Sequence, residues 1–197
     1  KIEWCDHTIN PVKGLCPMGC SYCYARRMYN RFKWNPEIRY SALWWEELEH
    51  IKKPSRIFLG STMELFGEWV NWAWLKYIFQ KCESYPQHTF IFLTKRPEKL
   101  IKWSPFPPNC WIGVSTTGFD GNSMLEDIFA NIKATVKLVS IEPLLDYSPM
   151  DFRWVDWVIV GQQTPATIKT KPRLEWIKSI IETADKDNVP IFLKDNL

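Results

Sequence analysis

Three cysteines near the start of the chain have the spacing of metal ligands. Cys16, Cys20 and Cys23 form a C-x3-C-x2-C array within the stretch GLCPMGCSYCYARRM, residues 14–28. A structural zinc site is normally closed by four ligands, so zinc would need a fourth partner, for which His7 is the nearest candidate. An iron–sulfur cluster held by three thiolates instead leaves one iron open to bind and activate a small molecule. The array therefore predicts either a closed zinc site or an open, reactive cluster.

The segment after the array predicts a helix that supports such a cluster. The residues YARRMYNRF favour a helix that starts near Ser21, whose amino end would point free N–H groups at an anionic cluster. Its basic residues could meet an acidic electron donor or a phosphate, or form an ordinary solvated helix face. These basic residues are Arg26, Arg27, Arg31 and Lys33.

The remaining cysteines and the composition limit the class of protein. Cys5, Cys82 and Cys110 lack ligand spacing and are more typical of small buried residues than of ligands or hydrogen donors. The first residues, KIEWCDHTIN, lack the apolar core of a signal peptide, and no segment approaches the roughly 20 apolar residues that cross a bilayer. We therefore expect a cytoplasmic protein without disulfides. The net charge of +3 permits a phosphate or nucleic-acid partner without requiring one.

Strands and helices are expected to alternate along the chain. Short apolar runs rich in Val, Ile and Phe indicate buried strands, and stretches of helical period lie between them. Such runs predict a parallel sheet covered by helices, and with KIEWC as a possible first strand there are six or seven strands. That number is too small for a closed eight-stranded barrel, so we expect an open, partial (β/α)6-type barrel formed by one domain, residues 1–197. The runs are RIFLG (56–60), TFIFLT (89–94), CWIGVS (110–115), KLVSIE (137–142), WVIVG (157–161) and PIFLK (190–194).

Polar residues directly follow most of these runs. In parallel α/β folds the active site lies at the carboxyl ends of the strands, so the set predicts a functional rim. Lys95 and Arg96 are the members best suited to bind a carboxylate or phosphate. The full set is Asp6, His7, Ser61, Thr62, Glu64, Lys95, Arg96, Thr116, Thr117, Glu142, Gln162, Gln163, Thr164, Asp195 and Asn196.

The cysteine array, with Tyr22 in its aromatic position, resembles the C-x3-C-x-aromatic-C signature of the radical S-adenosylmethionine superfamily. In that superfamily the array also lies near the amino terminus, ahead of alternating strands and helices. Nearly the whole chain resembles a small phage-associated and prokaryotic family of unknown function. The resemblance rests on the stretches IEWCDHTINPVKG, FLGSTMELF, FLTKRPEKL, IGVSTT, SIEPLL and WVIVGQQT.

The resemblance implies a cofactor pair and a chemistry. Cys16, Cys20 and Cys23 would ligate a [4Fe-4S] cluster, and the amino and carboxylate groups of S-adenosylmethionine would chelate the fourth iron. An electron from reduced flavodoxin or ferredoxin, at low oxygen, would cleave S-adenosylmethionine to methionine and a 5'-deoxyadenosyl radical that removes hydrogen from a substrate carbon. The protein would supply orientation and exclusion of water.

The same resemblance suggests residues that bind S-adenosylmethionine. Tyr22 would lie near the adenine. Gly60, Ser61 and Thr62 fall where superfamily members often have Gly-Gly-Glu, a segment that receives the methionyl ammonium. Here the carboxylate would come from Glu64, two residues on. Ser115 and Glu142 are candidates for the ribose hydroxyls or the methionyl group.

The sequence leaves the substrate and the catalytic residues open. Lys95, Arg96 and the helix with Arg26 favour a nucleotide or nucleic-acid base. A second possibility is an activase or peptide-modifying enzyme that acts on a partner protein. A rival of another class is a binding module stabilised by zinc on the three cysteines and His7.

Overall fold

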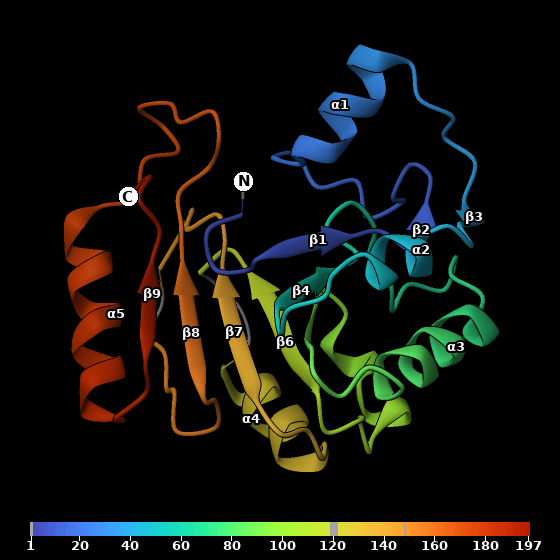
Figure 1. The fold of residues 1–197 in the computed structure, drawn as a ribbon. Coiled ribbons are helices and arrows are strands. Elements are labelled where there is room, and N and C mark those ends of the chain that lie inside the picture. Colours follow the sequence, from blue (N-terminus) through green and yellow to red (C-terminus); the bar gives the residue numbers. More distant parts are fainter. Residues whose placement is uncertain (1, 119–121, 148) are drawn as a thin grey trace.

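The computed structural model describes residues 2–118, 122–147 and 149–197. Its main element is a seven-stranded sheet in the order β1-β4-β5-β6-β7-β8-β9, in which every neighbouring pair is parallel (Figure 1). The strands are β1 (His7–Ile9), β4 (Arg56–Leu59), β5 (Thr89–Thr94), β6 (Cys110–Thr116), β7 (Lys137–Ile141), β8 (Trp157–Val160) and β9 (Ile191–Leu193). The sheet curls into a half-barrel, which confirms the expected open α/β barrel.

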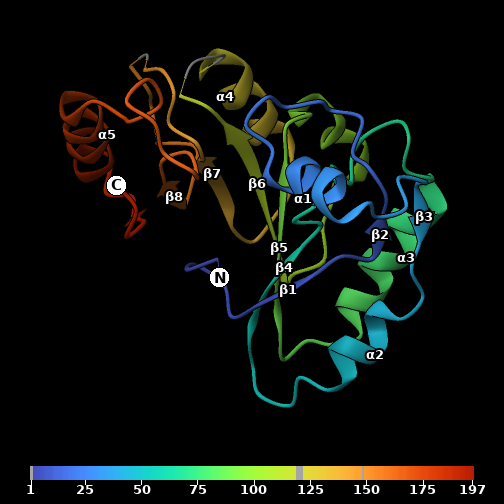
Figure 2. The same cartoon turned by 90° about the horizontal axis from the view of Figure 1, so that it is seen from above.

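Helices cover the convex face of this sheet, as the view from above shows (Figure 2). Apolar side chains of α2 (Trp44–Glu49), α3 (Trp72–Glu83), α4 (Asn122–Asn131) and α5 (Leu174–Lys186) share one buried cluster with alternate strand residues. Because successive strand residues point to opposite faces, the other strand residues face the concave side. The large hydrophobic core therefore lies between the convex face of the sheet and the helices. The concave face is left available for a functional site.

A smaller apolar cluster lies at the base of the concave face. Trp4 and Cys5, which are 2% and 3% exposed, pack there against Phe58, Ile91 and the strands beyond. The segment before β1 therefore crosses the inside of the half-barrel. The prediction that KIEWC is the first strand is wrong, because its apolar residues are buried by packing across the sheet and the first strand begins at His7.

The cysteine array lies between a small two-stranded sheet and α1. β2 (Val12–Lys13) pairs antiparallel with β3 (Arg39–Tyr40), and α1 (Tyr24–Phe32) lies between these strands in the chain. In Figure 1 α1 stands above the large sheet, and β2 and β3 lie beside α2. Among the described residues, no helix is both long and apolar enough to cross a membrane.

Candidate active site

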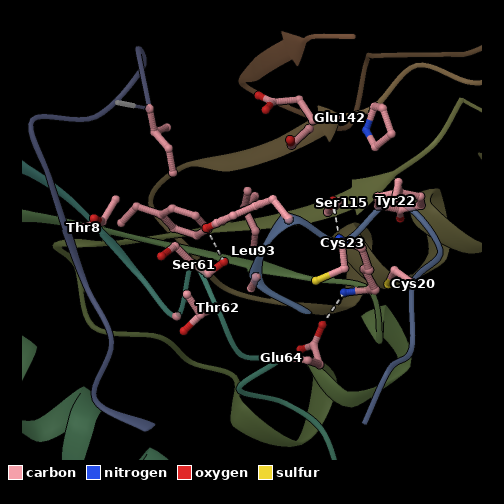
Figure 3. A pocket seen from close by; sticks show the side chains of 18 of the residues that line it. Thr8, Cys20, Tyr22, Cys23, Ser61, Thr62, Glu64, Leu93, Ser115 and Glu142 are labelled. Atoms are coloured by element: carbon pink, nitrogen blue, oxygen red, sulfur yellow. Dashed lines mark hydrogen bonds between the residues drawn. The ribbon is translucent and has the colours of Figure 1, made fainter. Parts of the chain in front are cut away.

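A cavity of about 630 Å³ opens at the carboxyl ends of the strands. The cysteine loop forms one wall and the loop after β4 forms another (Figure 3). The segment that leads into β1 and residues at the ends of β5 to β9 also line the cavity. All ten predicted metal and cofactor residues border it: Cys16, Cys20, Tyr22, Cys23, Gly60, Ser61, Thr62, Glu64, Ser115 and Glu142. The fold therefore brings together residues that are up to 126 positions apart in the sequence, from Cys16 to Glu142.

The cysteine loop is held by backbone groups and by the start of α1. α1 begins at Tyr24, three residues after the predicted Ser21, and Cys23 is its N-cap. The Cys23 Sγ accepts a hydrogen bond from the Arg26 N–H at 3.4 Å. The Cys23 N–H donates to the Cys20 carbonyl at 3.1 Å, and Arg26 Nη2 donates to the Cys16 carbonyl at 2.7 Å. The amino end of α1 therefore lies directly at a cysteine of the array.

Burial and neighbouring charges govern the ionisation of this loop. Burial raises the pKa of the Cys16 thiol, while the N–H groups of Glu64 and Met18 favour its thiolate. Burial also raises the pKa of Tyr22, and the nearby Cys20 acts in the same direction. Tyr22 is therefore a neutral hydrogen-bond donor beside the cysteines.

A zinc site and an iron–sulfur cluster require different arrangements of donor atoms. Within the described residues, no three His, Cys, Asp or Glu side chains are grouped so as to hold one metal ion. A closed zinc site requires such a group, whereas thiolates on a [4Fe-4S] cluster each bind a different iron and stand further apart. Three thiols on one cavity wall, with a helix amino end behind them, provide ligands for three corners of a cluster.

The loop after β4 is tied to the end of β1 by Asn10. Asn10 Oδ1 accepts hydrogen bonds from the N–H and the hydroxyl of Thr62, both at 3.0 Å, and lies 3.2 Å from the Ser61 hydroxyl. A hydroxyl that donates its proton to Asn10 keeps its lone pairs for another donor. Gly60, which begins the loop, has φ +81, and a Cβ there would lie 2.7 Å from Leu65 Cγ. Only glycine fits this turn without strain.

Glu64 is almost buried, with 8% of its surface exposed. Its Oε1 accepts hydrogen bonds from the Thr94 hydroxyl at 2.7 Å and the Phe66 N–H at 3.1 Å, and its Oε2 accepts one from the Lys95 N–H at 2.7 Å. Burial raises the pKa of this carboxyl, whereas the three donors lower it. Since a carboxylate oxygen has two lone pairs, Oε2 has room for one more donor.

Lys95 lies between the cysteine loop and the sheet. Its Nζ donates to Ser115 Oγ at 2.9 Å and lies 5.9 Å from the centre of the Tyr22 ring. Arg96 instead points away from the cavity, where Glu68 receives its guanidinium through two hydrogen bonds of 3.0 and 2.7 Å. The prediction that Arg96 serves the site is therefore wrong, because acidic residues outside the cavity bind it.

The far wall contains an ion pair. Glu142 follows β7 and Lys194 follows β9; Nζ of Lys194 lies 3.2 Å from Oε2 of Glu142, and the side chains are 15% (Lys194) and 22% (Glu142) exposed. The Trp4 indole N–H donates to Oε1 of Glu142 at 2.9 Å. These contacts fix the Glu142 carboxylate, which lies across the cavity from Thr62 and Glu64 in Figure 3.

Comparison with known proteins places the chain in a family. The profile described as "Protein of unknown function (DUF5131)" matches residues 1–196. The chain belongs to the DUF5131 family. A search of curated proteins finds no match.

Two solved structures resemble this DUF5131 chain. A cysteine mutant of spore photoproduct lyase is 14% identical with a TM-score of 0.64, and the match covers 98% of this chain and 78% of the lyase. Spore photoproduct lyase complexed with dinucleoside spore photoproduct is 12% identical with a TM-score of 0.56, covering 93% and 75%. At such identities the likeness shows a shared partial-barrel fold. The phage association expected from the sequence stays a prediction.

Several site residues of this DUF5131 chain escaped prediction. Asn10 was overlooked because the first strand was placed too early, and Lys194 because the last strand was read one residue too far at its carboxyl end. Asp6 and His7 were expected beyond a strand, but His7 begins β1 and Asp6 lies at its amino end. Both still border the cavity, whereas the cavity excludes Thr116, Thr117, Asp195 and Asn196.

Proposed function

We propose that this DUF5131 protein is a radical S-adenosylmethionine enzyme in which Cys16, Cys20 and Cys23 hold a [4Fe-4S] cluster. The observation that carries the proposal is the position of the three thiols on one wall of a cavity at the strand ends, opposite polar side chains. The likeness in fold to spore photoproduct lyase supports it. A reduced flavodoxin or ferredoxin is the proposed electron donor.

The loop after β4 binds the methionyl end of S-adenosylmethionine in this proposal. The Thr62 hydroxyl donates to Asn10, so its lone pairs accept from an ammonium group. Oε2 of Glu64 supplies one further acceptor and a negative charge. The Gly60 turn lets the backbone approach the cofactor closely.

The other walls orient the rest of the cofactor. When bound, the cluster and S-adenosylmethionine supply one-electron cleavage of the sulfonium and a 5'-deoxyadenosyl radical that removes hydrogen. Tyr22 contacts the adenine, and Ser115, held by Lys95, faces the ribose. Glu142 keeps its carboxylate near the same end of the cavity through Trp4 and Lys194. The apolar cluster below the cavity excludes water from the reacting atoms.

A nucleotide or nucleic-acid base is the substrate class that the remaining wall supports best. Gln162 and Gln163 follow β8 and border the cavity, and an amide side chain presents a donor and an acceptor to a base edge. Among the described residues, Gln162 Oε1 is a buried atom without a hydrogen-bond partner. One of the two structures of similar fold is a complex with a dinucleoside spore photoproduct. The second candidate, an activase that acts on a partner protein, has no such supporting contact.

The metal content of anaerobically purified protein tests this proposal. We expect brown protein with about four irons and four sulfides per chain, and Cys16→Ala, Cys20→Ala or Cys23→Ala should remove them. Cys82→Ala and Cys110→Ala serve as matched controls, because both side chains are fully buried in the convex core and should leave the iron in place.

Two further variants distinguish the proposed cluster from the rival zinc site. Cys5→Ala and His7→Ala should also retain the iron, since neither residue is assigned to the cluster. A colourless protein with one zinc that is lost in His7→Ala would establish the zinc module instead.

A further inference from the structure

Positive charge is concentrated on two segments at the mouth of the cavity. The first covers residues 24–36, which form α1 and the turn after it, and the second covers residues 163–173, which follow β8. They carry four and three positive charges and no negative charge, whereas the whole chain has a net charge of +3. The rest of the chain is therefore net negative, and the cationic surface is local to these mouth segments.

The mouth segments are joined to each other and to the cavity. Arg27 of α1 donates a hydrogen bond to the carbonyl of Thr164. Tyr24 and Thr164 both border the cavity, so the segments meet at its edge. Figure 1 shows α1 and the loop after β8 above the carboxyl ends of the strands. Six of their basic residues are exposed: Arg27, Arg31, Lys33, Lys169, Lys171 and Arg173.

The end of α1 also presents an exposed aromatic pair. Phe32 and Trp34 are 51% and 43% exposed and stack with ring centres 5.6 Å apart at 23°. Lys33 between them has φ 54, which turns the chain so that Trp34 returns over the helix end. Arg31 lies 5.2 Å from the centre of the Phe32 ring. Aromatic faces beside cations are the surface on which unpaired bases stack.

We propose that the mouth segments bind a single-stranded nucleic acid, so that the substrate of the proposed enzyme is a base within a strand and not a free nucleotide. The inference rests on the proposed function for the identity of the site. At 1.5 Å per residue, the aromatic pair lies about 12 Å along α1 from the edge of the cavity. A mononucleotide bound in the cavity does not reach the aromatic pair, whereas the neighbouring nucleotides of a nucleic-acid strand do. Lysines and arginines on both segments bind the phosphates.

Binding of a fluorescent single-stranded oligonucleotide, as DNA and as RNA, tests this proposal. We expect Phe32→Ala/Trp34→Ala to weaken binding at least about fivefold, since stacking on an aromatic side chain contributes at least about that much per base. Lys169→Gln/Lys171→Gln should reduce the slope of log affinity against log salt by about 1.4. The Lys169→Gln/Lys171→Gln variant removes no apolar contact, so it tests nucleic-acid binding by the mouth segments even if the aromatic variant folds poorly.

A tryptophan on the convex face provides the matched control. Trp72 is 65% exposed at the start of α3, with Lys76 Nζ 6.0 Å from its ring centre. Trp72→Ala/Lys76→Gln removes the same kinds of group away from the cavity and should leave oligonucleotide affinity unchanged. Binding needs neither reductant nor S-adenosylmethionine, so its outcome is independent of whether the cluster chemistry exists.

Three results would overturn the proposal. One is oligonucleotide affinity that is the same in wild type and in both mouth-segment variants. Another is equal weakening in the Trp72→Ala/Lys76→Gln control. The third is unchanged oligonucleotide binding with slower reduction of the cluster by an acidic flavodoxin, which would assign the surface to the electron donor.

Discussion

Asn10 offers the sharpest perturbation of the proposed cofactor site, because its side-chain hydrogen bonds hold the loop after β4. Replacing Asn10 by Ala removes the acceptor for the Thr62 N–H and hydroxyl and for the Ser61 hydroxyl. Each hydrogen bond of this kind contributes about 1 kcal/mol to stability. Water at the cavity edge replaces part of this, so we expect the free energy of unfolding to fall by about 1–3 kcal/mol.

The same substitution should also weaken the binding of S-adenosylmethionine. With Asn10 absent, the Thr62 hydroxyl no longer has a fixed acceptor and its lone pairs are no longer aimed at the cavity. The loss of one hydrogen bond to a charged group corresponds to about 1.5–3 kcal/mol, or tenfold or more in affinity. Asn10→Asp keeps the accepting oxygens and should retain most of the affinity.

The magnetic resonance spectrum of the reduced cluster, titrated with S-adenosylmethionine, provides the assay. Iron content should be equal in wild type, Asn10→Ala and Asn10→Asp, because the cluster ligands lie on another element. The reasoning is refuted if Asn10→Ala titrates like wild type, or if Asn10→Asp is weakened as much as Asn10→Ala.

Two further predictions concern stability. Lys194→Met should lower the free energy of unfolding by about 1–3 kcal/mol in urea titrations, because it leaves the largely buried Glu142 carboxylate without its cation. Adding Glu142→Gln should recover part of the loss, and a double variant as unstable as the single one would contradict the ion-pair explanation. His88 is 1% exposed and burial lowers its pKa, so the unfolded chain binds the proton first and wild-type stability falls as pH drops through about 6.5. His88→Leu should lose less stability than wild type between about pH 7.5 and pH 5.5, and an equal loss would exclude His88 as the cause.

The sheet could be predicted from the sequence because its strands are buried on both faces. Six apolar runs corresponded to β4 to β9, with ends that differ by at most one residue. β1 could not be predicted from an apolar run, because it has only three residues, His7–Ile9, and only Ile9 is buried. The apolar residues before it pack across the concave face, a contact that no local periodicity reveals. α2 was overlooked for a similar reason, since it has only six residues.

In the candidate site, too, local features could be predicted from the sequence and contacts between distant residues could not. The cysteine array is local, so its spacing alone indicates a metal or cluster site. Asn10 with Thr62, and Glu142 with Lys194, are each pairs of residues 52 positions apart. Such pairs depend on strand register, which the sequence alone does not supply. The role of Arg96 was mistaken because the carboxylate that receives its guanidinium, Glu68, lies 28 positions away in the sequence.

Reductive cleavage of S-adenosylmethionine by the anaerobic protein tests the proposed chemistry most directly. Wild-type protein with a strong one-electron reductant should form 5'-deoxyadenosine and methionine in equal amounts, measured by chromatography and mass spectrometry. Cys16→Ala, Cys20→Ala and Cys23→Ala should form neither, whereas Cys82→Ala should behave as wild type. Cluster-loaded wild-type protein that binds S-adenosylmethionine yet releases no 5'-deoxyadenosine, with or without a nucleic-acid strand, would contradict the assignment.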